Sequence, residues 1–137
     1  MNLELGLARE LLEDARLLLA QDRHRSTVSR AYYAAYHACI ALMENVGLRP
    51  QNYPGKNGRP ASRWEHGIIT AEVATDARLS EILTPPVALQ LRWQYMQRIR
   101  GDYRVRETIS SLTAQTGVSL AEQIVITVEG YLNAQHS

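Results

Sequence analysis

The sequence predicts an all-α protein, an antiparallel up-and-down bundle of four to five helices in a single domain of residues 1–137. Apolar residues recur at helical spacing in several long stretches. No convincing stretch alternates apolar and polar residues as a half-buried strand does. A chain of 137 residues that is 45% apolar and 21% charged is also large enough to fold around one core.

The central helix of the predicted bundle is the stretch STVSRAYYAAYHACIALMENVG, residues 26–47. It contains no proline, Ser26 suits an N-cap, and Gly47 suits the position just past the helix end. Arg30 and His37 lie seven positions apart, and therefore on the same side of the helix, among small residues. The opposite side is apolar and consists of Tyr32, Ala35, Tyr36, Cys39, Leu42 and Met43.

An amphipathic helix from Leu3 to about Gln21 is predicted before the central helix. Leucine and alanine recur in it at spacings of three and four residues, and its acids lie toward its first half. The polar link of residues 22–25 is short, so we expect the two helices to form an antiparallel hairpin.

The segment 48–61, LRPQNYPGKNGRPA, interrupts the helical pattern and is called the basic loop below. It holds three prolines, two glycines, three cations and no acid. Proline removes backbone donors and glycine is conformationally permissive. With almost nothing apolar to bury, the segment is predicted to be mobile.

Shorter helices are predicted after the basic loop. Ser62 to Glu65 forms a capping-box pattern, which favours a helix over about 63–73. A short helical piece follows and is closed by Pro85 and Pro86, and the next helix spans 87–100. Residues 104–117 are predicted to be an irregular connector, in which RETISSL, residues 106–112, is also compatible with a turn or two of helix. A second capping box at Ser119 favours a last helix through about residue 133.

Composition excludes several classes of protein. Cys39 is the single cysteine, so the chain forms no internal disulfide, and it has no zinc-site spacing. No metal or other cofactor is predicted. No signal peptide or membrane span is recognisable, so we expect a cytoplasmic protein without a membrane partner. Fourteen of the fifteen cations are arginine, which suits phosphate or carboxylate recognition, although solvated helix faces also account for them.

Three motifs in this order resemble the HEPN domain: SRAYYAAYHACIAL in the central helix, EHGII at 65–69 and RIRGDY at 98–103. The resemblance covers roughly residues 5–133 and is strongest to the small prokaryotic branch with the pattern SRxYYAxFH followed by RxxADY. Tyr36 stands where that branch usually has phenylalanine, and Gly101 where it usually has alanine. The resemblance implies a helical bundle that dimerises.

Two functions follow from the resemblance. Many HEPN proteins are toxins or defence ribonucleases that use an arginine, four to six variable residues and then a histidine, and Arg30 and His37, with six residues between them, fit that spacing. A histidine supplies an acid or base and an arginine balances phosphorane charge without metal. Other HEPN proteins are non-cleaving partners of minimal nucleotidyltransferases. The alternative is therefore a nucleotide-binding or partner subunit, with RNA or nucleotide as ligand.

Five further residues are assigned to the pocket on the resemblance: Tyr33, His66, Arg98, Asp102 and Tyr103. Simpler structural roles stay open for them. Arg98 and Asp102 are four positions apart and suit an intrahelical ion pair. His66 suits a hydrogen bond within the bundle.

Structural roles also stay open for Arg30 and His37. Arg30 would pair with Glu44 or another acid, and His37 would be a hydrogen-bonded interface residue. Small residues such as Ala34 and Ala41 permit close approach of another helix. We therefore expect a homodimer that packs through this side of the central helix and doubles the Arg30/His37 site across the interface.

Overall fold

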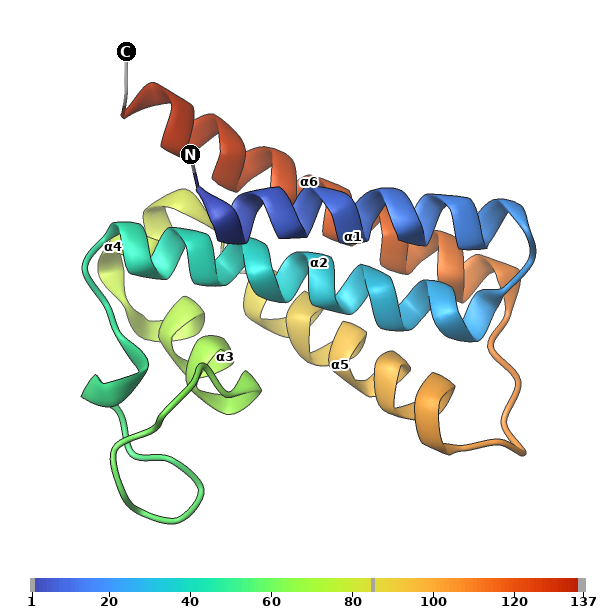
Figure 1. Cartoon of the computed structure of the whole chain (residues 1–137), viewed down its shortest axis with the longest axis horizontal. Helices are drawn as coiled ribbons and strands as arrows, with labels where there is room; N and C mark the ends of the chain where they lie inside the picture. Colours follow the sequence, from blue (N-terminus) through green and yellow to red (C-terminus); the bar gives the residue numbers. More distant parts are fainter. Residues whose placement is uncertain (1, 85, 136–137) are drawn as a thin grey trace.

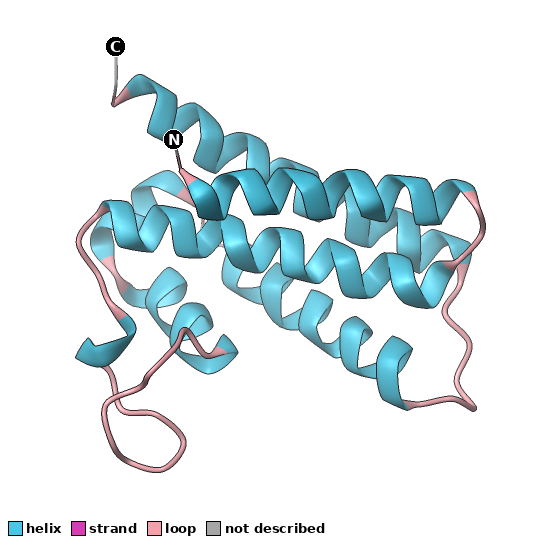
Figure 2. Ribbon diagram, viewed as in Figure 1, coloured by secondary structure: helices cyan, strands magenta, loops and turns pink. Residues whose placement is uncertain are grey.

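The structure, a computed structural model, describes residues 2–84 and 86–135 and confirms the all-α bundle (Figure 1). Figure 2 shows no strand in these two ranges. None of their helices is long and apolar enough to cross a membrane. The elements are α1 (Leu3–Ala20), α2 (His24–Asn45), the 3₁₀ turn η1 (Pro50–Asn52), α3 (His66–Thr75), α4 (Ala77–Ile82), α5 (Val87–Tyr103) and α6 (Ser111–Ala134).

The predicted hairpin of α1 and α2 is confirmed. The two helices lie side by side and antiparallel (Figure 1), and Asp22 makes the turn with a φ of 59°. α2 begins at His24 with Arg23 as its N-cap residue, and no side chain caps it. The predicted N-cap at Ser26 is therefore wrong by three residues.

The end of α2 follows the prediction. Gly47 has a φ of 92°, in the left-handed region that glycine adopts without strain. The N–H of Leu48 donates to the carbonyl of Met43 (3.0 Å), and the N–H of Gly47 donates to the carbonyl of Glu44 (3.1 Å). This pair of hydrogen bonds is the Schellman motif, and it satisfies carbonyls that the helix end would leave free.

α2 is the centre of the bundle and contacts α1, α3, α5 and α6. Ala34 and Ala41 are 0% and 1% exposed and belong to the core of the same chain. The prediction that a second subunit packs on these alanines is therefore wrong, because helices of the same chain already cover them, and the homodimer itself stays a prediction. Small residues there let the neighbouring helices of the chain approach closely.

The basic loop folds back on itself as a hairpin. Gly55 donates a backbone hydrogen bond to Arg59 (2.7 Å), and Ala61 donates one to Tyr53 (2.9 Å). The ring of Tyr53 lies against that of Trp64, with centroids 5.9 Å apart, and Ala61 is buried. The expectation that this loop has almost nothing apolar to bury is therefore wrong for its base. Its mobility stays a prediction.

Neither predicted capping box begins a helix. α3 begins at His66, four residues after Ser62, and no side chain caps it. α6 begins at Ser111, eight residues before Ser119, so part of the predicted irregular connector is helical. The hydroxyl of Ser110 caps α6 by accepting a backbone hydrogen bond at 3.0 Å.

The short helix and the long helix predicted on either side of the proline pair are confirmed as α4 and α5. Asp76 caps α4 through two backbone hydrogen bonds to its Oδ1. α5 continues to Tyr103, three residues beyond the predicted end. Pro86 precedes α5, and Pro85 lies outside the described residues.

The C-terminal end of α5 is attached to the start of α2. Gly101 is buried where the two helices meet, and a Cβ atom there would lie 3.0 Å from the carbonyl oxygen of Arg25 and 3.0 Å from Cγ2 of Val28. The guanidinium of Arg25 also donates to carbonyls at the end of α5, namely those of Arg100 (3.2 Å), Gly101 (3.1 Å) and Arg104 (3.2 Å). These contacts fix the position of α5 relative to α2.

Candidate functional site

An open groove of about 330 Å³ lies where α2, α3 and α5 meet, next to the basic loop. Aromatic rings come from all three helices and from the segment before α3, and cations come from α5, the basic loop and that segment. The lining residues are Tyr32, Tyr33, Tyr36, Lys56, Arg63, Trp64, Glu65, His66, Tyr95 and Arg98.

His66 is held between two tyrosines at the inner side of the groove. Its Nδ1 is 3.1 Å from the hydroxyl of Tyr32, and its ring stacks on Tyr95 with centroids 4.0 Å apart and an interplanar angle of 12°. Burial, and to a lesser extent the charge of Arg92, lower the pKa of His66. The imidazole is therefore neutral at neutral pH.

Tyrosines of α2 form one wall of the groove. The ring of Tyr32 meets that of Tyr33 edge to face at 5.2 Å, and Tyr36 meets Tyr33 in the same way at 6.1 Å. Tyr36 donates its hydroxyl hydrogen to the carbonyl of Trp64, which fixes that ring. The hydroxyls of Tyr33 and Tyr95 have no partner in the part of the chain that the structure describes. They are free to meet a ligand.

The cations of the groove differ in their surroundings. Arg98 lies 5.3 Å from the centroid of the Tyr33 ring, and its Nε is 3.1 Å from Oδ2 of Asp102. The predicted ion pair between Arg98 and Asp102 is therefore confirmed. Arg63 and Lys56 have no ion-pair partner among the described residues, and Glu65 is the carboxylate that lines the groove. The groove therefore offers unneutralised positive charge beside aromatic rings.

His37 lies outside the groove and adjoins it through a tyrosine. Its Nδ1 is 2.6 Å from Oε2 of Glu4 on α1, and its ring meets that of Tyr36 edge to face at 5.1 Å. The side chain is partly buried. His37 is thus a hydrogen-bonded residue between α1 and α2, with a carboxylate that orients its ring.

Arg30 is exposed on α2 and has no hydrogen-bond or ion-pair partner among the described residues. The predicted pairing with Glu44 is wrong, because the Oε2 of Glu44 accepts the indole N–H of Trp64 at 3.1 Å. Arg30 and His37 are two helical turns apart, about 10 Å along the axis. They lie on the same side of α2, as predicted.

The groove brings together three of the seven predicted site residues: Tyr33, His66 and Arg98. Asp102 and Tyr103 do not line it, but both adjoin it through Arg98, which lies 5.6 Å from the Tyr103 ring. Seven further lining residues were not predicted from the sequence to bind a ligand: Tyr32, Tyr36, Lys56, Arg63, Trp64, Glu65 and Tyr95. One available signal was composition, since the chain has seven tyrosines and no phenylalanine.

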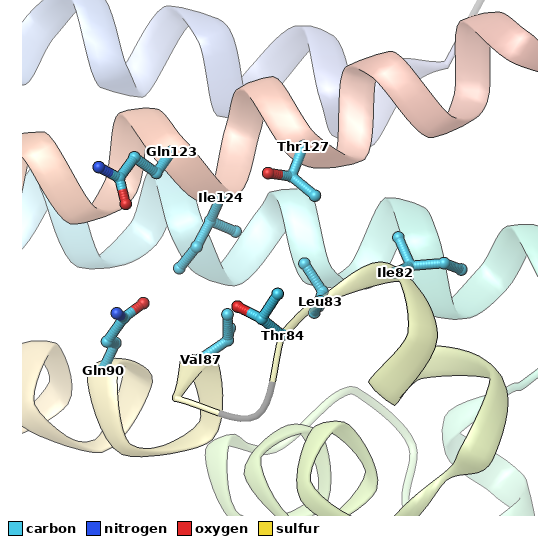
Figure 3. A pocket seen from close by; sticks show the side chains of 8 residues that line it. All are labelled: Ile82, Leu83, Thr84, Val87, Gln90, Gln123, Ile124 and Thr127. Carbon is cyan, nitrogen blue, oxygen red and sulfur yellow. The ribbon is translucent and has the colours of Figure 1, made fainter.

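A second hollow is a weaker candidate. It lies beside α4, α5 and α6 (Figure 3), has a volume of about 90 Å³, and is lined by aliphatic and uncharged polar side chains. It offers no titratable group for chemistry. Within residues 2–84 and 86–135, no cluster of three histidine, cysteine, aspartate or glutamate side chains could hold a metal ion. The groove is therefore the better candidate for a binding site.

Comparison with known proteins gives one short similarity. No family model matches the sequence. The chain is 44% identical over 48 residues to a UPF0332 protein of Thermotoga maritima. The match covers 35% of this chain and 36% of that protein, about a third of the length of either. The name of that relative states no activity.

Proposed function

We propose that this chain is a HEPN-like protein of a prokaryotic toxin–antitoxin or defence pair, and that its groove binds RNA or a nucleotide. The observation that carries the proposal is the meeting of tyrosine rings and unpaired cations in one groove. The order of the SRAYYAAYHACIAL and RIRGDY motifs within an all-α bundle supports the HEPN-like part.

The chemistry of the groove matches the two parts of a nucleotide. Bases stack on tyrosine rings, and this contact tolerates any base because every base has a flat face. The guanidinium of Arg63 and the ammonium of Lys56 are placed to contact phosphate, and the hydroxyl of Tyr33 can donate to it. A groove of about 330 Å³ also suits a ligand of this size.

Binding is tested by fluorescence anisotropy with a labelled single-stranded RNA and, in competition, with mononucleotides. Tyr33→Ala removes one stacking ring and should weaken binding by about 1–3 kcal/mol. Arg63→Ala removes one phosphate contact and should weaken binding in the same assay. Arg106→Ala is the control, since Arg106 is exposed between α5 and α6 and does not line the groove. Unchanged binding by both groove variants would refute the proposal.

RNA cleavage by Arg30 and His37 is the second candidate, and the bond between Glu4 and His37 favours it. A carboxylate that accepts from one ring nitrogen orients the imidazole and leaves the other nitrogen for proton transfer. Arg30 is exposed and unpaired among the described residues, so it is available for the charge of a phosphorane.

Cleavage is tested on unstructured RNA with metal chelated. His37→Ala should lower the rate by about 10²–10⁴-fold. Arg30→Ala should do comparable damage, and Arg30→Lys should restore activity only in part. His24→Ala, a change in the first turn of α2, is the control. If wild-type protein never cuts RNA, alone or with a nucleotidyltransferase, the non-catalytic partner subunit replaces the ribonuclease, and the binding assay judges the groove separately.

A further inference from the structure

Among the described residues, a single carboxylate lines a groove that otherwise carries cations and aromatic rings. Glu65 is the N-cap residue of α3, but its side chain does not cap that helix. It has no hydrogen-bond or ion-pair partner in the described structure, although Lys56 and Arg63 line the same groove. A carboxylate repels phosphate, so a groove that held only phosphates would be better without it. Glu65 therefore suits another part of the ligand, one that donates hydrogen bonds.

The carboxylate lies at the hydroxyl end of the tyrosine wall. The hydroxyl of Tyr36 donates to the carbonyl of Trp64, the residue before Glu65. Burial, and to a smaller extent the charge of Glu65, raise the pKa of Tyr36, so the carboxylate is within electrostatic reach of that phenol. Glu65 also lies beside the basic loop, which Figure 1 shows below α3, since a Cβ atom at Gly55 would be 3.2 Å from its Oε2.

The surroundings of Glu65 leave room for the edge of a base. Two further hollows, of about 450 and 360 Å³, adjoin the groove, since Lys56 and Glu65 line all three. The residue is half-buried, so part of its hydration is lost and no hydrogen bond from the described residues replaces it. A ligand that donates hydrogen bonds at this point would supply the replacement.

We propose that Glu65 makes the groove selective for guanine by accepting two hydrogen bonds from the edge of that base. The inference rests on the proposed function, since it concerns a base that stacks on the tyrosines of the groove. Guanine presents its N1–H and its N2 amino group side by side, and these two donors match the two oxygens of one carboxylate.

The other common bases of RNA do not match a carboxylate in this way. Adenine and cytosine each present one amino group next to a ring nitrogen that is an acceptor. Uracil presents one N–H between two carbonyl oxygens. In each case an acceptor of the base faces an oxygen of Glu65, and the two repel each other. Guanine is therefore the common base that satisfies both oxygens.

The test measures binding of labelled pentanucleotides to the full chain by fluorescence anisotropy. The RNAs are UUGUU, UUAUU, UUCUU, UUUUU and UUIUU, in which I is inosine. A good bidentate contact discriminates against the wrong base by about 5- to 150-fold, so UUGUU should bind more tightly than UUAUU by a factor in this range. Inosine keeps N1–H but lacks the N2 amino group, so UUIUU should bind with intermediate affinity.

Glu65→Gln replaces one acceptor oxygen by an amide that donates, and it should reduce the preference for UUGUU over UUAUU to less than about threefold. Its affinity for UUAUU should be unchanged or higher, because a negative charge near the phosphates is lost. A damaged fold would instead weaken binding of both RNAs. Glu72→Gln is the matched control. Glu72 also belongs to α3 and lines an adjoining hollow but not the groove, so the same loss of charge should leave the preference for guanine intact.

The outcomes separate this inference from the proposed function. Equal binding of all the RNAs by the wild-type chain, or a preference for guanine that survives in Glu65→Gln, would overturn the selectivity and leave binding in the groove intact. Loss of the preference in Glu72→Gln as well would also overturn it, because a general change in charge would then account for the effect. If none of the RNAs binds, the proposed function fails and the selectivity fails with it.

Discussion

At the scale of single residues, His66 is a half-buried histidine whose pKa the fold lowers. Its pKa is lowered by burial and by Arg92, so the folded chain resists protonation that the unfolded chain accepts near the ordinary value of 6.5. Stability contributed by the neutral ring is present above that value and is lost as the pH falls below it. Stacking on Tyr95 and the bond to Tyr32 both depend on the position of this ring.

We therefore predict that acid weakens the fold partly through His66. Between about pH 7.5 and pH 5.5, the free energy of unfolding of the wild-type chain should fall more than that of His66→Gln. Urea denaturation at several pH values measures both, and the carboxylates, which titrate mostly lower, contribute similarly to the two proteins. Identical pH dependence in the two proteins would contradict the lowered pKa.

The residues of the groove were predictable only in part. The resemblance pointed to Tyr33, His66 and Arg98, which do line it. Helical periodicity describes one helix at a time, and it assigned Tyr32 and Tyr36 to the core face of α2. The groove lies at the edge of that face, and it forms because α3 and α5 pack beside α2. No pattern within one helix carries that information.

At the scale of elements, long periodic helices were predictable and their starting points were not. A capping box is a local pattern, and burial of nearby residues can override it. Trp64, within the predicted first turn, is instead buried in the non-helical segment before α3. In α6 the helix continues through Gly117, whose carbonyl accepts a hydrogen bond from the buried Gln94 at 3.0 Å. Tertiary contacts therefore placed both starting points.

Two glycines in long helices should respond oppositely to alanine. At Gly101 the new Cβ would meet a backbone oxygen and a buried valine at 3.0 Å, so Gly101→Ala should cost about 1–3 kcal/mol of stability. At Gly130 in α6 nothing lies within 4 Å, so Gly130→Ala should gain roughly 0.5–1 kcal/mol from helix propensity. Thermal denaturation checks both, and an unchanged or higher stability of Gly101→Ala would contradict the close packing of α5 on α2.

The basic loop should show two levels of motion. The backbone N–H groups of Lys56 and Asn57, at its tip, make no hydrogen bond in the described structure and should exchange fastest among the internal residues. Ala61, which donates to Tyr53, should exchange more slowly. Hydrogen exchange followed by NMR resolves these amides. Protection of the tip equal to that of α2 would contradict the predicted mobility.

At the scale of the whole molecule, positive and negative charges nearly cancel, and several of them cancel between neighbouring side chains. The net charge is +1. Arginines on the α1 and α5 sides are neutralised by acids of other segments, as in the pairs of Arg16 with Glu122 (2.9 Å) and Arg100 with Glu107 (3.5 Å). Arg63 and Lys56 at the groove have no such partner among the described residues. Arg30, outside the groove, is also unpaired among the described residues, but Arg63 and Lys56 are the unpaired cations that line the groove itself, so we expect them to supply its attraction for a polyanion.

The salt dependence of RNA affinity should show how many cations of the groove contact phosphates of the RNA. For single-stranded RNA, each phosphate that a cation neutralises makes the slope of the logarithm of the binding constant against the logarithm of the salt concentration more negative by about 0.7. Contacts from Arg63 and Lys56 therefore predict a slope of about −1.4, and Arg63→Ala should reduce it to about −0.7. Arg106→Ala should leave the slope unchanged. A slope of about −4 or steeper would mean that RNA binds across the surface instead of in the groove, because the groove does not hold enough unpaired cations to produce it.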